Sequence, residues 1–347
     1  MLDNKVQGEP KLKDSQNKKR KLVILIPIFN DWEALEELLL LIDEIGTPQE
    51  YNLEILIVDD YSTKPLPESL AYRKYRQLQT VNILRLRRNL GHQRAIAVGL
   101  CYIHDNLSCS VVVVMDGDGE DNPFEIVRLL EALNRSVGDS IIFAKRSKRS
   151  ENCTFRLFYF AYKIIYWLLT GRDSSVGNFS LLPGSLLRNI VVISELWNHY
   201  SASIYRSKIP YIEVNVPRSK RLAGQPKMSL VSLVTHGLSS IAVYGDVVGT
   251  RILLSTSFLS VFLLFLLLIV LLIKLFTNWG IPGWTTYVSG LLILALFQVI
   301  LIGTVFSMII LSARNSSNFL PIRDYKYYVD GFYTVIAWKS LHTLEKN

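Results

Sequence analysis

The first half of the chain alternates short, strongly apolar segments with segments of mixed character. Continuous apolar runs are typical of strands that are buried on both faces of a sheet. Such runs lie at residues 22–28 and 111–115, and the apolar-rich segments 53–58, 81–86 and 140–144 predict three more strands. Apolar residues at helical spacing follow the first run, and residues 92–103 are typical of another helix. This order predicts an α/β fold with a mostly parallel, Rossmann-like sheet covered by helices on both faces.

Polar residues follow three of the predicted strands directly. Asn30 ends the first, Asp59-Asp60 the second, and Asp116-Gly117-Asp118 the fourth. Ligands of parallel sheets bind beyond the carboxyl ends of the strands. The sequence therefore predicts a site at this edge of the sheet.

Two uncharged apolar runs, 252–273 and 287–312, are each long enough to cross a bilayer. The loop between them carries Trp279 and Trp284, as expected at a membrane interface. Basic residues flank the pair on its outer sides. By the positive-inside rule, we expect a multi-pass membrane protein with its catalytic domain and both termini in the cytosol, in the inner membrane if the cell is bacterial.

Two further apolar segments precede these runs. Residues 155–169 are rich in aromatic side chains and indicate either a helix in the membrane interface or a buried core helix. Residues 230–248 keep helical spacing and predict a second interfacial helix. The expected organisation is a polar tail (1–20), a catalytic domain (21–228), an amphipathic helix (229–250), two spans (within 251–313) and a cytosolic C-terminal tail (314–347).

Composition narrows the class of partner. The 347 residues carry a formal net charge of +8, with basic clusters at 18–21 and 218–227. Beside membrane helices, such clusters favour phosphorylated small molecules and anionic lipid over nucleic acid as partners. The cluster at 18–21 is equally compatible with a solvated tail. Cys101, Cys109 and Cys153 lack metal-binding spacing, which favours reduced thiols in the cytosol. The polar first 21 residues predict no secretory signal peptide.

The acidic pair Asp116 and Asp118 predicts a divalent-cation site. Two carboxylates at the end of a buried strand offer hard oxygen ligands for Mg²⁺ or Mn²⁺ and leave positions for phosphate oxygens. Glu120 and Asp121 add acidic oxygens nearby, and a solvated acidic turn is the alternative. A carboxylate of Asp59-Asp60 is suited to a nucleobase N–H or a ribose hydroxyl, but the same residues are common in turns. Dinucleotide, P-loop, zincin and serine-hydrolase motifs are absent from the sequence.

The motifs together resemble glycosyltransferase family 2, which has the GT-A fold. The branch is that of polyprenyl-phosphate glycosyltransferases, relatives of dolichol-phosphate mannose synthase with two C-terminal membrane helices. The resemblance spans roughly residues 22–312 and rests on VILIPIFND (23–31), IVDDYS (57–62), RRNLGHQRAIAVGL (87–100), MDGDGEDNP (115–123), VGNFSLL (176–182) and RSKRLAGQPKMS (218–229).

The resemblance implies an inverting transfer from a UDP- or GDP-sugar to an undecaprenyl or dolichyl phosphate, with Mg²⁺ or Mn²⁺ as cofactor. It implies a nucleotide pocket shaped by Pro27, Asn30 and Asp31, in which Asp59 and Asp60 bind the base or the ribose. It also implies a turn beside the nucleotide, formed by Asn89, Gly91, His92 and Gln93. It also implies that Asp116 and Asp118, with Glu120 nearby, hold metal and diphosphate. The last implied element is a basic loop over donor or lipid phosphate, with Arg218, Arg221, Gly224 and Lys227; a juxtamembrane linker is the alternative.

The sequence departs from the family pattern at three positions. Asp31 stands where Glu is usual, Glu120 where Gln is frequent, and Asn178 where the related branch carries an Asp that is a candidate catalytic base. An amide cannot accept a proton in that role, but a lipid phosphate is already ionised, and Asp116 or Glu120 would serve for a hydroxyl acceptor.

Glu195 and His199 are spaced to share one helix face, as part of an acceptor pocket or of an ordinary helix surface. Two other functions stay open at this point. A processive polysaccharide synthase is disfavoured by the absence of Q-x-x-R-W and by only two spans. The departure at Asn178 leaves room for a non-enzymatic nucleotide-sugar sensor or scaffold. A homo-oligomer is also open.

Overall fold

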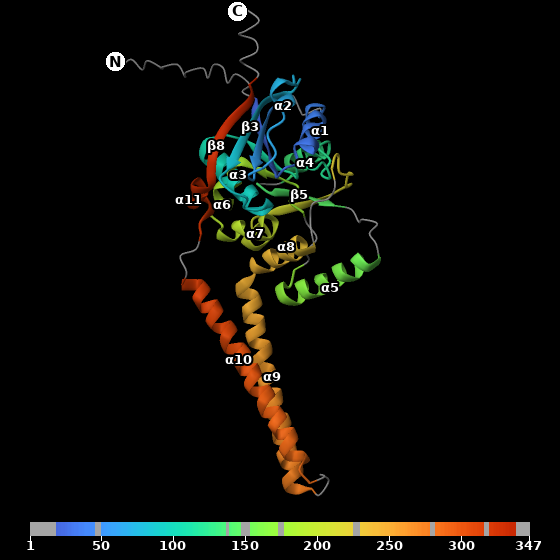
Figure 1. The fold of residues 1–347 in the computed structure, drawn as a ribbon, viewed down its shortest axis with the longest axis vertical. Coiled ribbons are helices and arrows are strands. Elements are labelled where there is room, and N and C mark those ends of the chain that lie inside the picture. Colours follow the sequence, from blue (N-terminus) through green and yellow to red (C-terminus); the bar gives the residue numbers. More distant parts are fainter. Residues whose placement is uncertain are drawn as a thin grey trace, which may run out of the picture.

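The structure is a computed structural model that describes residues 19–45, 50–136, 139–146, 153–172, 177–224, 230–277, 282–315 and 319–337. A globular α/β domain stands above two helices, α5 and α8, and a long helical hairpin of α9 and α10 extends away from them (Figure 1). Lys18 and Lys227 of the predicted basic clusters lie outside the described residues.

Eight strands form one mixed sheet in the order β7-β5-β6-β4-β1-β2-β3-β8. β1 to β4 run parallel, while β6 and β8 run antiparallel to their neighbours. The predicted strands are all present, so the expected mostly parallel, GT-A-like α/β fold is confirmed. The bounds are β1 Arg20–Ile28, β2 Tyr51–Asp59, β3 Leu78–Leu86, β4 Val111–Val114, β5 Ile141–Arg146, β6 Ser180–Pro183, β7 Tyr211–Val216 and β8 Val329–Ala337.

Hydrophobic cores fill both faces of the sheet. Along β1, Leu22 and Ile24 enter one core and Val23 and Leu25 the other. A strand that is buried on both faces needs apolar residues at every position, which explains the continuous runs in the sequence. One face is covered by α1 (Trp32–Asp43), α2 (Glu68–Tyr72) and α4 (Glu125–Arg135). The other is covered by α3 (His92–Asn106), η1 (Gly184–Leu186), α6 (Leu187–Ile190), η2 (Ser194–Trp197) and α7 (Tyr200–Ser207).

Two helices lie between the domain and the hairpin: α5 (Cys153–Thr170) and α8 (Leu230–Ala242). Tyr166 of α5 packs against Ala202, Val243 and Tyr244. The other large apolar side chains described on these helices include exposed ones, namely Phe160, Ile164, Ile165, Trp167, Leu168, Val234 and Leu238. The described part of α5 is therefore not a fully buried core helix.

The amphipathic helix expected over 229–250 is shorter in the structure. α8 ends at Ala242, because the chain turns there and the N–H of Tyr244 donates to the carbonyl of Ile241 at 2.9 Å. Val243 and Tyr244 are buried in this turn, which separates α8 from α9.

Both predicted spans are helical, in α9 (Gly245–Phe276) and α10 (Trp284–Asn315). Their most apolar windows have mean hydropathies of 3.1 and 2.6, and only 6% of each is buried. A core helix of a soluble protein would be mostly buried, so these exposed apolar helices indicate membrane association.

Residues 319–337 of the segment expected as a tail belong to the globular domain instead. α11 (Pro321–Asp324) and η3 (Tyr325–Tyr328) lead into β8, which pairs antiparallel with β3 (Figure 1). The expectation was wrong because a lone edge strand has a weak sequence signal, and its partner β3 lies far away in the chain.

Candidate active site

The carboxyl ends of β1, β2 and β4 bring the predicted residues to one edge of the sheet. Asn30 lies just beyond β1 with a left-handed φ of 56°. Its Oδ1 accepts hydrogen bonds from the N–H groups of Thr63 and Lys64, both at 2.8 Å, and its own N–H donates to Ser62 Oγ. Asn30 therefore shapes the loop after β2, and Pro27 is buried in β1 beside Val58.

The neighbouring carboxylates of Asp59 and Asp60 have different partners. Asp60 is 2% exposed, and its two oxygens accept from the N–H groups of Leu90 and Gly91 at 2.7 and 2.8 Å. Burial raises the pKa of Asp60 to about 6, although these hydrogen bonds oppose the shift. Asp60 thus holds the turn that contains Asn89 and Gly91, which leads into α3.

Asp59 faces a pocket at the ends of β2 and β3, here called the β2–β3 pocket. Its Oδ1 accepts from the N–H of Ser62 at 2.8 Å, and its Oδ2 lies 4.0 Å from Arg85 Nε. The pocket has a volume of about 470 Å³. It is lined by Trp32, Asp59, Ser62, Thr63, Lys64, Pro65, Leu66, Ile83, Arg85 and Tyr333.

The loop after β4 carries Asp116, Asp118 and Glu120. The N–H of Asp116 donates to Oδ2 of Asp121, and the N–H of Glu120 donates to Oδ1 of Asp118, both at 3.0 Å. Asp121 is 2% exposed, so it stabilises the loop from inside. Gly119 adopts a φ of 79°, and a Cβ there would lie 2.3 Å from Leu222 Cγ. Glycine thus permits close approach of the basic loop that follows β7.

That basic loop lies directly on the acidic loop. Arg221 Nη1 donates to Asp118 Oδ2 at 3.1 Å, and the same guanidinium forms an ion pair with Asp31. Arg218 forms an ion pair with Glu120. The N–H of Leu222 also donates to the carbonyl of Asp118 at 3.0 Å. Gly224 closes the described part of the loop with a φ of 73°.

A polar network joins Asp116 to the first turn of α3. His92 Nε2 lies 3.1 Å from Asp116 Oδ1 and 2.9 Å from Asn178 Nδ2. Gln93 donates to Asn178 Oδ1 at 3.1 Å and accepts from the N–H of Tyr200 at 2.7 Å. Burial lowers the pKa of His92, but the hydrogen bond to Asp116 and the negative charges of Asp116, Asp118 and Asp121 together outweigh it, so the net shift is upward. Asn178 is 8% exposed and lies within this network, where its amide orients neighbours.

The donor set of the acidic loop fits a divalent cation. Asp116 and Asp118 supply the hard carboxylate oxygens that Mg²⁺ and Mn²⁺ prefer. Among the described residues, no three His, Cys, Asp or Glu side chains gather into a metal cage. Arg218 engages Glu120 and Arg221 engages Asp118 Oδ2, so a cation held by Asp116 and Asp118 would share Asp118 with Arg221 and take its remaining ligands from a bound molecule.

Glu195 and His199 do not share one helix face, contrary to expectation. Glu195 lies in η2, whereas His199 has extended backbone (φ −160°) and begins α7 as its N-cap, accepting weakly from the N–H of Ala202. His199 Nε2 lies 3.3 Å from His236 Nε2 of α8. Burial, followed by the charges of the neighbouring histidines, lowers the pKa of His199 to about 3.

Sequence reasoning missed several of these residues. It did not assign Trp32, Arg85 and Tyr333 to the pocket. It also missed Arg206 of α7, which binds Glu195 of η2 and Asp246 at the start of α9. The run FYTVIA at 332–337 is rich in β-branched and aromatic residues, and this was the available signal for β8.

Comparisons with known proteins agree with this geometry. Residues 23–182 match the model of "Glycosyl transferase family 2". An uncharacterized glycosyltransferase of Bacillus subtilis (strain 168), YkcC, is 26% identical over 81% of this chain and 86% of its own length. The undecaprenyl-phosphate 4-deoxy-4-formamido-L-arabinose transferase of Photorhabdus laumondii is 27% identical, over 82% of this chain and 87% of its own.

A solved structure offers a more distant likeness. Glucosyl-3-phosphoglycerate synthase from Mycobacterium tuberculosis, in complex with Mn²⁺, UDP-glucose and phosphoglyceric acid, is 15% identical. The match covers 70% of this chain and 86% of that one with a TM-score of 0.46, too low to carry a ligand assignment. With its sheet and its acidic loop after β4, the matched region of residues 23–182 is a glycosyltransferase family 2 domain.

Proposed function

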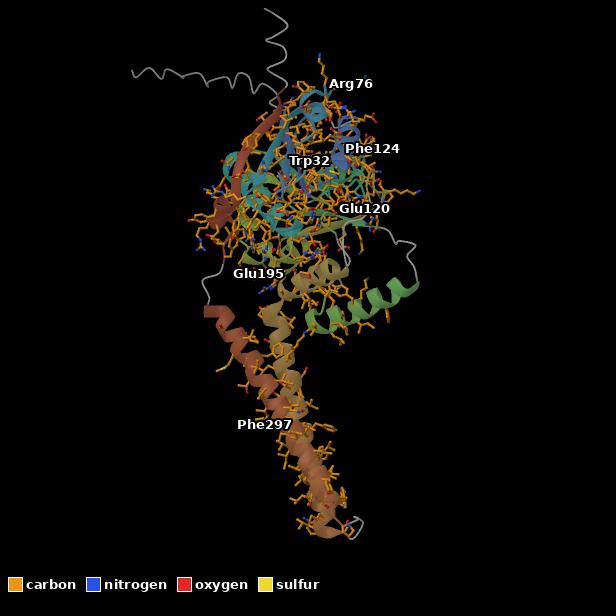
Figure 2. The ribbon with its side chains drawn as sticks, in the orientation of Figure 1. Trp32, Arg76, Glu120, Phe124, Glu195 and Phe297 are labelled. Carbon is orange, nitrogen blue, oxygen red and sulfur yellow. The ribbon has the colours of Figure 1, made fainter. Side chains whose placement is uncertain are left out.

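We propose that this protein transfers a sugar, with inversion, from a UDP- or GDP-sugar to a polyprenyl phosphate at the cytosolic face of a bilayer. The observation that carries the proposal is the acidic pair Asp116 and Asp118, which lies under a basic loop at the carboxyl edge of the sheet. In Figure 2, Glu120 of this loop lies nearer than Trp32 to the helices α5 and α8. The undecaprenyl-phosphate transferase among the relatives supports the acceptor class.

The donor diphosphate would bind between the acidic pair and the basic loop. Arg218 and Arg221 each bind a carboxylate in the structure, so their positive charge already lies at this position. Phosphate oxygens are good partners for guanidinium groups, because they accept paired hydrogen bonds. A Mg²⁺ or Mn²⁺ ion held by Asp116 and Asp118 would neutralise charge that develops on the departing nucleoside diphosphate.

The acceptor would reach this site from the membrane. The exposed apolar side chains of α5 and α8 suit a bilayer interface, and the hairpin of α9 and α10 would anchor the domain there. Because β8 returns to the sheet after α10, both ends of the hairpin lie on the side of the catalytic domain. A spanning hairpin would therefore leave the domain and the described C-terminal strand on the same side of the membrane.

The reaction needs no protein base if the acceptor is an ionised phosphate. A phosphate oxygen would attack the anomeric carbon while the bond from that carbon to the diphosphate oxygen breaks. The leaving nucleoside diphosphate would take the electron pair. This chemistry is compatible with Asn178, whose amide touches His92 and lies 3.5 Å from Asp116 Oδ1.

The test is transfer by the purified full chain in lipid nanodiscs, with a panel of labelled nucleotide-sugars and undecaprenyl phosphate. We expect a lipid-linked sugar whose formation stops with a chelator and returns with Mg²⁺ or Mn²⁺. Asp118→Asn should lower turnover about 100-fold or more, because it weakens the binding of cation and diphosphate.

Asp139→Asn is the matched control, since this exposed carboxylate lies elsewhere, beside Ser185. It should leave turnover unchanged. Absence of a lipid-linked product with every donor would refute the acceptor assignment, and wild-type turnover by Asp118→Asn would refute the role of the acidic pair.

A further inference from the structure

The β2–β3 pocket is completed by the strand that follows the membrane hairpin. Across the sheet, Asp59 pairs with Arg85, and Arg85 pairs with Gly331 of β8. In the adjacent row, Ile83 pairs with Tyr333. Asp59, Arg85, Ile83 and Tyr333 all line the pocket, so β8 forms its outer wall.

Gly331 and Tyr333 give this wall its shape. A Cβ at Gly331 would lie 2.6 Å from Tyr333 Oη and 2.8 Å from Tyr333 Cζ, so the ring lies close over the glycine. Tyr333 is 54% exposed, which leaves much of its ring accessible. The neighbouring Phe332 stacks on Tyr102 of α3, with ring centroids 5.2 Å apart, and so belongs to the other face of the sheet.

The pocket adjoins the proposed diphosphate site through consecutive residues. Trp32 lines the pocket, and the preceding residue, Asp31, forms an ion pair with Arg221. Arg221 in turn binds Asp118. A ligand with its phosphates at the acidic loop would therefore have room for its next chemical group in the β2–β3 pocket.

The lining suits a nucleoside. At about 470 Å³ the pocket lies within the usual size range of small-molecule sites. Tyr333 supplies an aromatic surface, on which any of the nucleobases can stack. Asp59 Oδ2 and Arg85 place a hydrogen-bond acceptor beside a donor, which matches the mixed edge of a base or the hydroxyls of a ribose.

We propose that Tyr333 is a nucleoside-binding residue and that β8, which follows the membrane hairpin, completes the donor site. The inference rests on the proposed function, because it assigns the base side of the same nucleotide-sugar site. Its consequence is that donor affinity depends on a strand that reaches the sheet only after the chain has passed through α9 and α10.

The experiment measures equilibrium binding of UDP, GDP and pyrophosphate to the full chain in nanodiscs with Mn²⁺, by calorimetry. Tyr333→Ala should weaken the better-binding nucleotide about tenfold, as expected for the loss of one stacking partner. Pyrophosphate affinity should stay within about twofold, because pyrophosphate does not reach the pocket. Tyr333→Phe keeps the ring and should bind the nucleotide nearly as wild type does.

Two further variants distinguish an effect on the pocket from an effect on the folding of β8. Gly331→Val favours a strand conformation but places a side chain against the Tyr333 ring, so it should weaken nucleotide binding without lowering the thermal midpoint. Tyr327→Ala removes a tyrosine that is 76% exposed and lies outside the pocket lining, and it should change neither quantity.

The outcomes distinguish the two proposals. Wild-type nucleotide affinity in both Tyr333→Ala and Gly331→Val would overturn the inference and leave the proposed function intact. An equal loss of nucleotide and pyrophosphate affinity in Tyr333→Ala would also overturn it, since that pattern reports general disruption. If the wild type binds no nucleoside diphosphate at all, the proposed function fails and the inference fails with it.

Discussion

Asp59 and Asp60 are adjacent in the chain, but the fold gives them different tasks. Asp60 uses both oxygens to hold the turn before α3, while Asp59 directs one oxygen towards the β2–β3 pocket. Asp118 and Glu120 also have different partners, since Arg221 binds Asp118 and Arg218 binds Glu120. The type of a residue predicts which chemistry is available, and its partners decide which chemistry is used.

His199 provides a test at this scale through pH. Its pKa is lowered to about 3 in the folded protein, whereas an unfolded histidine has a pKa of about 6.5. Between these values the unfolded state binds more protons, so the free energy of unfolding falls as the pH drops below about 6.5. His199→Asn keeps an N-cap side chain for α7 and removes this titration.

Between pH 7 and pH 5, the free energy of unfolding of the wild type should therefore fall by about 2 kcal/mol more than that of His199→Asn. Chemical denaturation at the two pH values measures the difference. His104→Asn, at an exposed histidine of α3, controls for loss of a histidine as such. Equal losses in the wild type and in His199→Asn would contradict the assignment.

The helical elements of the hairpin pack through small residues. A Cβ at Gly249 of α9 would lie 2.2 Å from Cδ1 of Ile310 on α10, and one at Gly303 would lie 2.9 Å from Oγ1 of Thr256. Close approach at small residues is a usual source of association between membrane helices, because lipid provides no hydrophobic drive between them. The hairpin is thus a specific pair of helices as well as two apolar segments.

Gly249→Leu should separate the two helices locally and lower the thermal midpoint of the full chain in detergent by several degrees. Gly290→Leu is the matched control, because a Cβ at that glycine of α10 would meet nothing within 4 Å. Spin labels on α9 and α10 should report a longer separation only in Gly249→Leu. A shift of equal size in both variants would show that packing at Gly249 is unimportant.

For the whole molecule, the decisive feature is the junction between the catalytic domain and the hairpin. Arg206 of α7 binds Glu195 of η2 at 2.7 Å and Asp246 at the start of α9 at 3.0 Å, and it also contacts the carbonyl of Val243. Arg251 of α9 donates to the carbonyl of Leu168 near the end of α5 at 2.7 Å. These contacts orient the acidic loop relative to the proposed bilayer surface.

Arg206→Met should lower transfer to a membrane-bound lipid phosphate about tenfold, because small misplacement of reacting groups is costly. Nucleotide affinity should be unchanged, since Arg206 is not among the residues that line the β2–β3 pocket. Turnover in nanodiscs and calorimetry measure the two quantities. Arg188→Met, at an exposed arginine of α6, is the control, and a matching loss of nucleotide affinity in Arg206→Met would contradict the role of the junction.

The sequence alone determined the first five strands with the helices α1 and α3, the two long apolar helices and the edge at which the acidic residues gather. These features follow from local periodicity and from residues that end strands, and both are readable over a few positions. Only the tertiary structure decided that β8 joins β3, that Asp60 holds a turn while Asp59 lines a pocket, and that His199 caps α7 beside His236. Each of these depends on a partner distant in the chain, such as the carbonyl of Val329 that accepts from Arg87 Nε, and such pairings leave no periodic signal in the sequence.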